Sequence, residues 1–135
     1  MIGALLRVPW EDVQQRMLDR LHEDGFDDLD GAHLNVFRYP GPQGARPSEL
    51  AASLRVSKQA LNYLLGELER LGYLERRADP DDGRSKRVAL TRRGERVVRS
   101  MRNAVADVER DWEARLGPRR FAELRRLLQE LAEPM

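Results

Sequence analysis

The chain has 135 residues, of which 41% are hydrophobic and 35% are charged. This length fits one domain, and the composition is too charged for a membrane protein and too hydrophobic for a disordered one. Because there is no cysteine, disulfides, thiolate metal sites and thiol redox switches are excluded. No apolar run approaches the roughly 20 residues of a membrane span, and the first ten residues do not resemble a signal peptide. We therefore expect a folded cytoplasmic protein with no membrane partner.

The net charge of +1 is unevenly distributed along the chain. Residues 1–54 carry 5 basic and 9 acidic side chains, residues 55–99 carry 12 and 7, and residues 100–135 carry 7 of each. A basic middle segment in one small domain favours a surface that meets a polyanion. Arginine supplies 22 of the 24 positive charges, and codon bias is an alternative cause of this arginine content.

The first predicted element is a helix from Pro9 to about Glu23, because apolar residues recur there at spacings of three and four. They are Trp10, Val13, Met17 and Leu21. After an acidic interruption, Asp30 predicts the N-cap of a short second helix that ends at Tyr39. Residues 40–47, PGPQGARP, are expected to form a loop, and Pro47 suits the first turn of the next helix.

Two helices are then expected in close succession within residues 47–72. The first covers PSELAASLR, and the second covers SKQALNYLLGELERLG, with Ser57 as its cap and Gly72 as its stop. The segments YLERRA and SKRVAL predict two short strands around the turn DPDDGR. Thr91 caps a long helix that ends near Leu116, and a last helix follows.

The window that starts at Pro47 carries the apolar pattern of a helix-turn-helix. Its positions 4, 8, 10, 15 and 18 are Leu50, Leu54, Val56, Leu61 and Leu64, and its position 5 is the small Ala51. In such a motif these residues pack the two helices together, and the small residue lets the backbones approach. Arg55 departs from the pattern, since many such motifs have glycine in the turn. On this window alone, an ordinary helical hairpin is the alternative.

The predicted hairpin after this window favours the DNA-binding interpretation. A helix-turn-helix and a basic wing together form one DNA-binding unit, in which the second helix enters the major groove and the wing tip reaches an adjacent minor groove. Arg84 at the tip can enter the narrow groove, where the negative potential is strongest. Lys86 and Arg87 would meet phosphates, and Asp82 would hold the turn or the arginine in place. A purely structural hairpin is the alternative.

No residues for metal binding, cofactor binding or catalysis are predicted. The aspartates of DPDDGR suggest a calcium loop, but its sixth position would be Arg84 and its twelfth Leu90, where glycine and glutamate are required. The sequence has only two histidines, His22 and His33, and no Gly-rich phosphate loop or histidine at metal-ligand spacing from paired carboxylates. We therefore expect that the protein is not an enzyme.

The second helix of the motif has an outward face that suits DNA. Its helical period turns Leu61, Leu64, Leu65 and Leu68 toward the core and leaves Ser57, Lys58, Gln59, Asn62, Tyr63 and Gly66 on or near the outside. Gln59 and Asn62 can each pair with adenine through two hydrogen bonds, and Lys58 can reach guanine or phosphate. Ser57 and Tyr63 can bond to phosphate. Each could instead be a solvated surface residue. Gly66 in mid-helix suggests close backbone approach, with a merely tolerated glycine as the alternative.

These segments resemble the multiple-antibiotic-resistance regulators, the MarR family of winged helix-turn-helix proteins. The resemblance rests on PSELAASLRVSKQALNYLLGELERLGYLERR, on DPDDGRSKRVALTRRG and on the order of the flanking helices, so it covers nearly the whole chain. Its most specific part is a wing motif that matches at Asp82, Arg84, Leu90, Thr91 and Gly94. The residue between the aspartate and the arginine is often basic in the family and is Gly83 here.

The predicted elements and the resemblance imply one mainly α-helical winged helix-turn-helix domain, residues 1–135, with a small two-stranded β-wing. The DNA-binding lobe would span 47–94, with the wing at 73–91, and the N- and C-terminal dimerisation helices would lie in 1–39 and 95–135. The resemblance implies a homodimer, a palindromic double-stranded DNA operator and often a small-molecule effector. Apolar stripes in the terminal helices independently favour dimerisation, with packing inside one chain as the alternative.

We therefore expect a sequence-specific transcriptional regulator, and the family implies that repression is the commoner role. A winged-helix module that binds protein, and a DNA-binding regulator without a ligand, are the alternatives. The basic middle segment and the outward Lys58, Gln59 and Asn62 favour DNA. Candidates for a ligand pocket are Trp10, Trp112 and Phe26, although core packing is the alternative for each.

Overall fold

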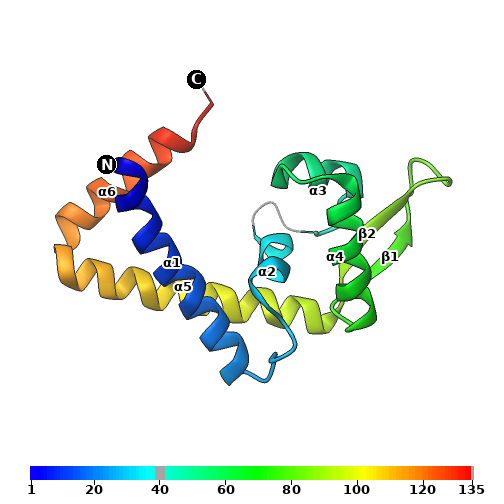
Figure 1. The fold of residues 1–135 in the computed structure, drawn as a ribbon, viewed down its shortest axis with the longest axis horizontal. Helices are drawn as coiled ribbons and strands as arrows, with labels where there is room; N and C mark the ends of the chain where they lie inside the picture. The colour runs from blue at the N-terminus through cyan, green and yellow to red at the C-terminus, as the bar shows by residue number, and fades with distance from the viewer. Residues whose placement is uncertain (39–41, 135) are drawn as a thin grey trace.

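The computed structural model describes residues 1–38 and 42–134. Its elements are α1 (Ile2–Glu23), α2 (Gly31–Phe37), α3 (Pro47–Leu54), α4 (Lys58–Arg70), β1 (Leu74–Ala78), β2 (Lys86–Leu90), α5 (Arg92–Leu116) and α6 (Pro118–Ala132). Figure 1 shows α1 and α6 at one end of the molecule, the helices α2 to α4 and the hairpin at the other, and α5 joining the two ends. The expected fold class, mainly helical with a small two-stranded sheet, is confirmed.

Helix α1 begins at Ile2, so the predicted start at Pro9 is wrong. Proline inside a helix removes the N–H that would bond the carbonyl four residues earlier, here that of Leu5, and its ring crowds that carbonyl. Residues 1–12 are exposed throughout, and Leu5 retains 67% of its accessible surface, so water can serve that carbonyl. Apolar periodicity indicated only the half of α1 that packs within the chain, where Met17 and Leu21 are buried.

Helix α2 begins at its predicted cap. The Asp30 carboxylate accepts hydrogen bonds from the backbone N–H groups of Ala32 at 2.9 Å and His33 at 3.2 Å. In return, Nδ1 of His33 accepts from the backbone N–H of Asp30 at 3.1 Å, which completes a capping box with histidine in place of the usual glutamate. The helix ends at Phe37, and its predicted end at Tyr39 lies outside the described residues.

The hairpin is paired in antiparallel register, with Leu74 opposite Leu90 and Ala78 opposite Lys86. The segment before α3, expected to be a loop, adds one bridge to it. Ala45 pairs with Val88, whose backbone N–H donates to the Ala45 carbonyl at 2.8 Å. This bridge joins the segment that leads into α3 to the base of the wing. The helix-turn-helix and the wing are therefore held in position relative to each other.

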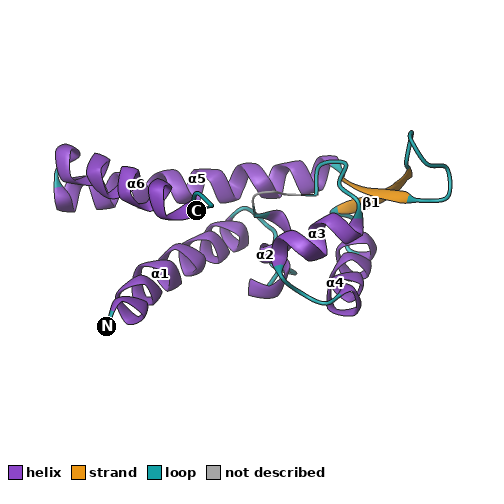
Figure 2. Ribbon diagram, turned by 90° about the horizontal axis from the view of Figure 1, so that it is seen from above, coloured by secondary structure: helices purple, strands orange, loops and turns teal. Residues whose placement is uncertain are grey.

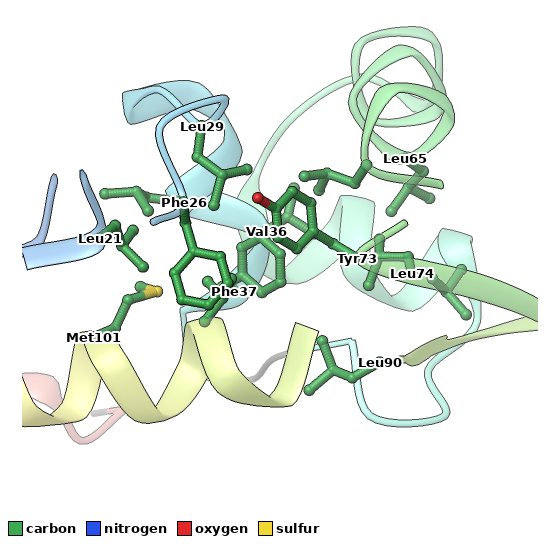
Figure 3. Packing of buried hydrophobic residues seen from close by; sticks show 14 of the residues in the cluster. Leu21, Phe26, Leu29, Val36, Phe37, Leu65, Tyr73, Leu74, Leu90 and Met101 are labelled. Carbon is green, nitrogen blue, oxygen red and sulfur yellow. The ribbon is translucent and has the colours of Figure 1, made fainter. Parts of the chain in front are cut away.

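Tyr73, between α4 and β1, is the centre of the core. It is fully buried and meets Phe26 and Phe37 edge to face, with ring centroids 6.1 and 6.2 Å away (Figure 3). Its hydroxyl donates to the Asp28 carboxylate, and the Arg93 guanidinium lies over its ring at 4.2 Å. The core therefore joins the acidic segment before α2 to the start of α5.

Long helix α5 starts and stops where expected. The Thr91 hydroxyl accepts from the backbone N–H of Gly94 at 3.1 Å, and Gly117 has φ of 86° at the C-cap. Among the described residues, no helix is long and apolar enough to cross a membrane.

Candidate DNA-binding surface

Helices α3 and α4 form the predicted helix-turn-helix. Of the apolar residues predicted to pack them together, Leu50, Ala51 and Leu61 are buried and Leu54 and Leu64 are half-buried. Val56 is 39% exposed, so its predicted burial is wrong. Arg55 adopts φ of 55° and ψ of 43°, the left-handed conformation in which glycine is common and other residues are strained. The departure from glycine therefore leaves the geometry of the turn intact.

The outer face of α4 carries the residues predicted to contact DNA. The exposed ones are Ser57, Lys58, Gln59, Asn62 and Tyr63, whereas Leu61, Leu65 and Leu68 are buried and Leu64 is half-buried. The division of this helix into a core face and an outer face is therefore confirmed. Apart from its chain neighbours and the backbone of its own helix, no described atom lies within 4 Å of a Cβ built on Gly66, so the close approach suggested there does not occur within the chain.

A chain of hydrogen bonds links this outer face to α2. The Tyr63 hydroxyl donates to Oε1 of Glu67 at 3.2 Å, one turn further along α4. The other oxygen of Glu67 lies 2.8 Å from Nε2 of His33. The hydrogen bond from His33 holds the pKa of Glu67 below its usual value, against the opposing effect of burial and with help from Tyr63. Neither Glu67 nor the role of His33 was predicted from the sequence.

The tip of the wing is held by Asp82. Its carboxylate accepts from the backbone N–H of Arg84 and from the hydroxyl of Ser85, both at 3.0 Å. Asp82 therefore fixes the turn, the first of the two roles considered for it. Figure 2 shows the hairpin projecting beyond α4. Arg84 and Lys86 are exposed there, and neither side chain forms a hydrogen bond or ion pair within residues 1–38 and 42–134.

Arg87 points inward, unlike Arg84 and Lys86. It donates to the carbonyl of Gly44, and its Nε lies 3.3 Å from Oδ1 of Asp79. The other oxygen of Asp79 accepts from Nε of Arg46 at 2.7 Å. Asp79 thus joins the wing to the segment before α3. With Arg46 and Arg87 it forms a structural cluster that was not predicted from the sequence.

The carboxylate of Asp79 is buried and remains charged. A hydrogen bond from the backbone N–H of Asp81, at 2.9 Å, and the guanidinium groups of Arg46 and Arg87 lower the pKa of Asp79 to about 2, although burial opposes the shift. No local sequence signal pairs Asp79 with Arg46, because 33 positions separate them.

The base of the wing is joined to α5 by a close backbone contact. A Cβ on Gly94 would lie 2.2 Å from the carbonyl oxygen of Tyr73, a separation that no side chain permits. The hydroxyl of Thr91 also donates to the Gly72 carbonyl at 2.6 Å. Two residues of the wing motif, Thr91 and Gly94, thus set the angle between the wing and α5.

A pocket of about 630 Å³ lies where α1, α2 and α5 meet the base of the wing at Leu90. Its walls are mainly apolar and include Trp10, Phe37 and Met101. The Arg38 guanidinium lies 4.8 Å from the centroid of the Trp10 ring and donates to Asn35 at 2.6 Å. Burial lowers the pKa of Arg38. Of the three aromatic candidates, Trp10 lines this pocket, Phe26 lies in the core and Trp112 is half-buried.

These elements define the class of protein, a winged helix-turn-helix protein with additional helices at both ends. The model of the MarR family matches residues 27–85, from the segment before α2 to the tip of the wing. The resemblance indicated by the sequence motifs is therefore confirmed, and the chain has the fold of MarR-family transcription regulators. No curated protein sequence matches the chain.

Solved structures extend the likeness to nearly the whole chain. Transcriptional regulator Tm0710 from Thermotoga maritima is 28% identical, with a TM-score of 0.63, over 96% of this chain and 90% of that one. Wild-type MarR from E. coli, in its apo form, is 22% identical, with a TM-score of 0.73, over 98% and 97%. CouR from Rhodococcus jostii RHA1, bound to p-coumaroyl-CoA, is 24% identical, with a TM-score of 0.71, over 99% and 93%.

Proposed function

We propose that this protein is a homodimeric repressor that binds a palindromic double-stranded DNA operator and is modulated by a small molecule. The observation that carries the proposal is the exposed polar face of α4 beside a projecting wing whose Arg84 and Lys86 have no partner in the described chain. Free cations suit phosphates and the minor groove, and outward amide side chains suit base edges. A regulator of chromosomal DNA acts in the cytoplasm and needs neither a cofactor nor catalytic residues.

The proposed contacts divide by chemistry. Gln59 and Asn62, with Lys58 beside them, read base edges in the major groove. Arg84 enters the minor groove from the wing tip, and Ser57 and Lys86 meet phosphates. The internal partners of Arg87 indicate a different role for that residue, which is to stabilise the wing.

Dimerisation is supported by apolar side chains that the single chain leaves uncovered. On α1, Leu5 is 67% exposed, and on α6, Leu131 is 79% exposed. Both helices lie at the end of the molecule opposite the DNA-binding lobe (Figure 1). A second copy that covers these faces would hold two α4 helices at a set spacing, which a palindromic site requires.

The effector site we propose is the pocket at the junction of α1, α2 and α5. A volume of about 630 Å³ suits a small organic molecule, and Trp10 and Phe37 suit an aromatic ring. Arg38 forms no ion pair with the described residues and can meet a negative group. CouR, of similar fold, binds p-coumaroyl-CoA, so that compound and p-coumarate are the first effectors to test.

Fluorescence anisotropy with DNA from immediately upstream of the gene, against scrambled DNA, tests the proposal. A preference of about a thousandfold or more, with affinity that falls steeply as salt rises, would support specific regulation. Equal, weak and salt-insensitive binding to both would favour the winged-helix module that binds protein. Release of the upstream DNA by an effector would separate the ligand-responsive regulator from one without a ligand, and a promoter-reporter assay would distinguish repression from activation.

A further inference from the structure

The hydrogen-bond chain from Tyr63 to His33 determines what Tyr63 can offer to DNA. A tyrosine hydroxyl has one proton to donate and lone pairs to accept with. In this structure the proton is directed to Oε1 of Glu67, 3.2 Å away, while Tyr63 as a whole is 68% exposed on the outer face of α4. The lone pairs of the hydroxyl are what remain for a partner outside the chain.

His33, at the other end of this series of hydrogen bonds, determines that the Tyr63 proton points to Glu67. Nδ1 of His33 lies 3.1 Å from the backbone N–H of Asp30, which can only donate, so Nδ1 accepts and the ring proton is on Nε2. The Asp30 carboxylate, 3.3 Å from the same nitrogen, already accepts two backbone N–H groups. Nε2 therefore donates to Glu67 at 2.8 Å, and the ionised carboxylate, which has no proton, accepts from both His33 and Tyr63.

We infer that Tyr63 is a base-reading residue that accepts from the exocyclic amine of adenine or cytosine, and that Glu67, held by His33, is the positioning residue that gives it this preference. Phosphate oxygens only accept, so a phosphate contact would require the bond from Tyr63 to Glu67 to break. In the major groove, adenine N6 and cytosine N4 donate, whereas guanine O6 and thymine O4 accept. The inference rests on the proposed function and assigns Tyr63 a role other than the phosphate contact predicted from the sequence.

Glu67→Gln should reverse this preference. The donor on His33 requires the carbonyl oxygen of the new amide to face it, so the NH₂ group faces Tyr63. That NH₂ donates to the tyrosine oxygen and releases the hydroxyl proton, which can then be donated to guanine or thymine. Since the variant changes one atom of the side chain, its shape is conserved.

The test is selection of binding sites from a random double-stranded DNA library by the full-length protein. The wild type should enrich adenine or cytosine at one position of each half-site, by about three- to tenfold, as expected for one hydrogen bond. Tyr63→Phe should lose the preference at that position only, and Glu67→Gln should favour guanine or thymine there. The double variant should match Tyr63→Phe, because Glu67 acts through the hydroxyl. Thermal melts of each protein establish that the variants are folded.

Three results would overturn the inference. One is an unchanged consensus for Tyr63→Phe with uniformly weaker and less salt-dependent binding, which marks a phosphate contact. Another is an unchanged consensus for Glu67→Gln. The third is enrichment of no sequence by the wild type, which would remove the proposed function itself and is thereby distinguishable from the first two.

Discussion

At the scale of single residues, two glycines on α-helices have opposite surroundings. Gly94 in the first turn of α5 has no room for a side chain, because its Cβ would meet the Tyr73 carbonyl at 2.2 Å. Gly66 in the middle of α4 has open space within the chain and an ordinary negative φ. The first is required by packing, whereas the second is an unfavourable residue for a helix.

Gly94→Ala should therefore lower the free energy of unfolding by about 1–3 kcal/mol, since the backbone of Tyr73 must move. Gly66→Ala, as the matched control, should raise it by up to about 1 kcal/mol through higher helix propensity. Urea denaturation followed by circular dichroism measures both changes. Equal effects of the two substitutions would show that the contact at Gly94 carries no strain.

At the scale of elements, the buried Asp79 joins the wing to the segment before α3. Its pKa of about 2 in the folded protein lies below its ordinary value of 3.8. A group whose pKa falls on folding stabilises the protein above its unfolded pKa and loses that contribution as pH falls through the folded one. The stabilisation by Asp79 should thus be complete above about pH 4 and be lost between about pH 4 and 2.

We predict that wild type and Asp79→Asn differ most in stability above pH 4 and converge toward pH 2. Denaturant unfolding at a series of pH values checks this. Asp81→Asn, which removes an exposed carboxylate from the same turn, serves as the control and should keep the slope of the wild type. A difference between wild type and Asp79→Asn that stays constant across this range would argue against the ionised, paired carboxylate.

Helix α4 and the wing should contribute differently to DNA binding. Asn62→Ala should lose about 1–3 kcal/mol on the specific site and little on random DNA, because a base contact is removed. Arg84→Ala should weaken binding to both DNAs and reduce the salt slope by about 1, because a cation is removed. Anisotropy titrations at several salt concentrations distinguish these patterns. Arg119→Ala, which removes an exposed cation from α6, is the control for net charge.

At the scale of the whole molecule, the end that carries the helix-turn-helix and the wing is packed within one chain, whereas the opposite end is not. The core around Tyr73 also includes side chains of α1, α2 and α5, but residues 1–12 and most of α6 are exposed in the described chain. Uncovered apolar helices of this extent suit the dimer interface that we propose. The spacing of two lobes, and hence the operator, would depend on how these helices pair.

Leu131→Glu should convert the dimer to a monomer, because a buried charge would lie in the interface. Sedimentation equilibrium should give twice the chain mass of 15.6 kDa for the wild type and the chain mass for the variant. Gln129→Glu adds the same charge on the same helix as a control. A wild type that sediments as a monomer at micromolar concentration would contradict the proposed dimer.

Much of the fold could be predicted because it depends on neighbours in the sequence. The caps Asp30, Ser57 and Thr91 act on backbone groups two or three positions away, and each forms its predicted bonds. Gly72 ends α4 with φ of 86°, as expected. The inner and outer faces of α4 follow from its period alone. The outward residues of the candidate site on α4 could be predicted from the same helical period.

The order of the elements, the helix-turn-helix with its wing, and the exposed face of α4 thus follow from local patterns in the sequence. Three contacts depend instead on the packing of distant segments: Arg87 turns inward to Asp79, Glu67 bonds to both His33 and Tyr63, and Ala45 bridges to Val88. Local signals arise from backbone geometry over a few residues, whereas these pairs join residues far apart in the chain. Packing of the whole domain brings each pair together, and no periodicity encodes it.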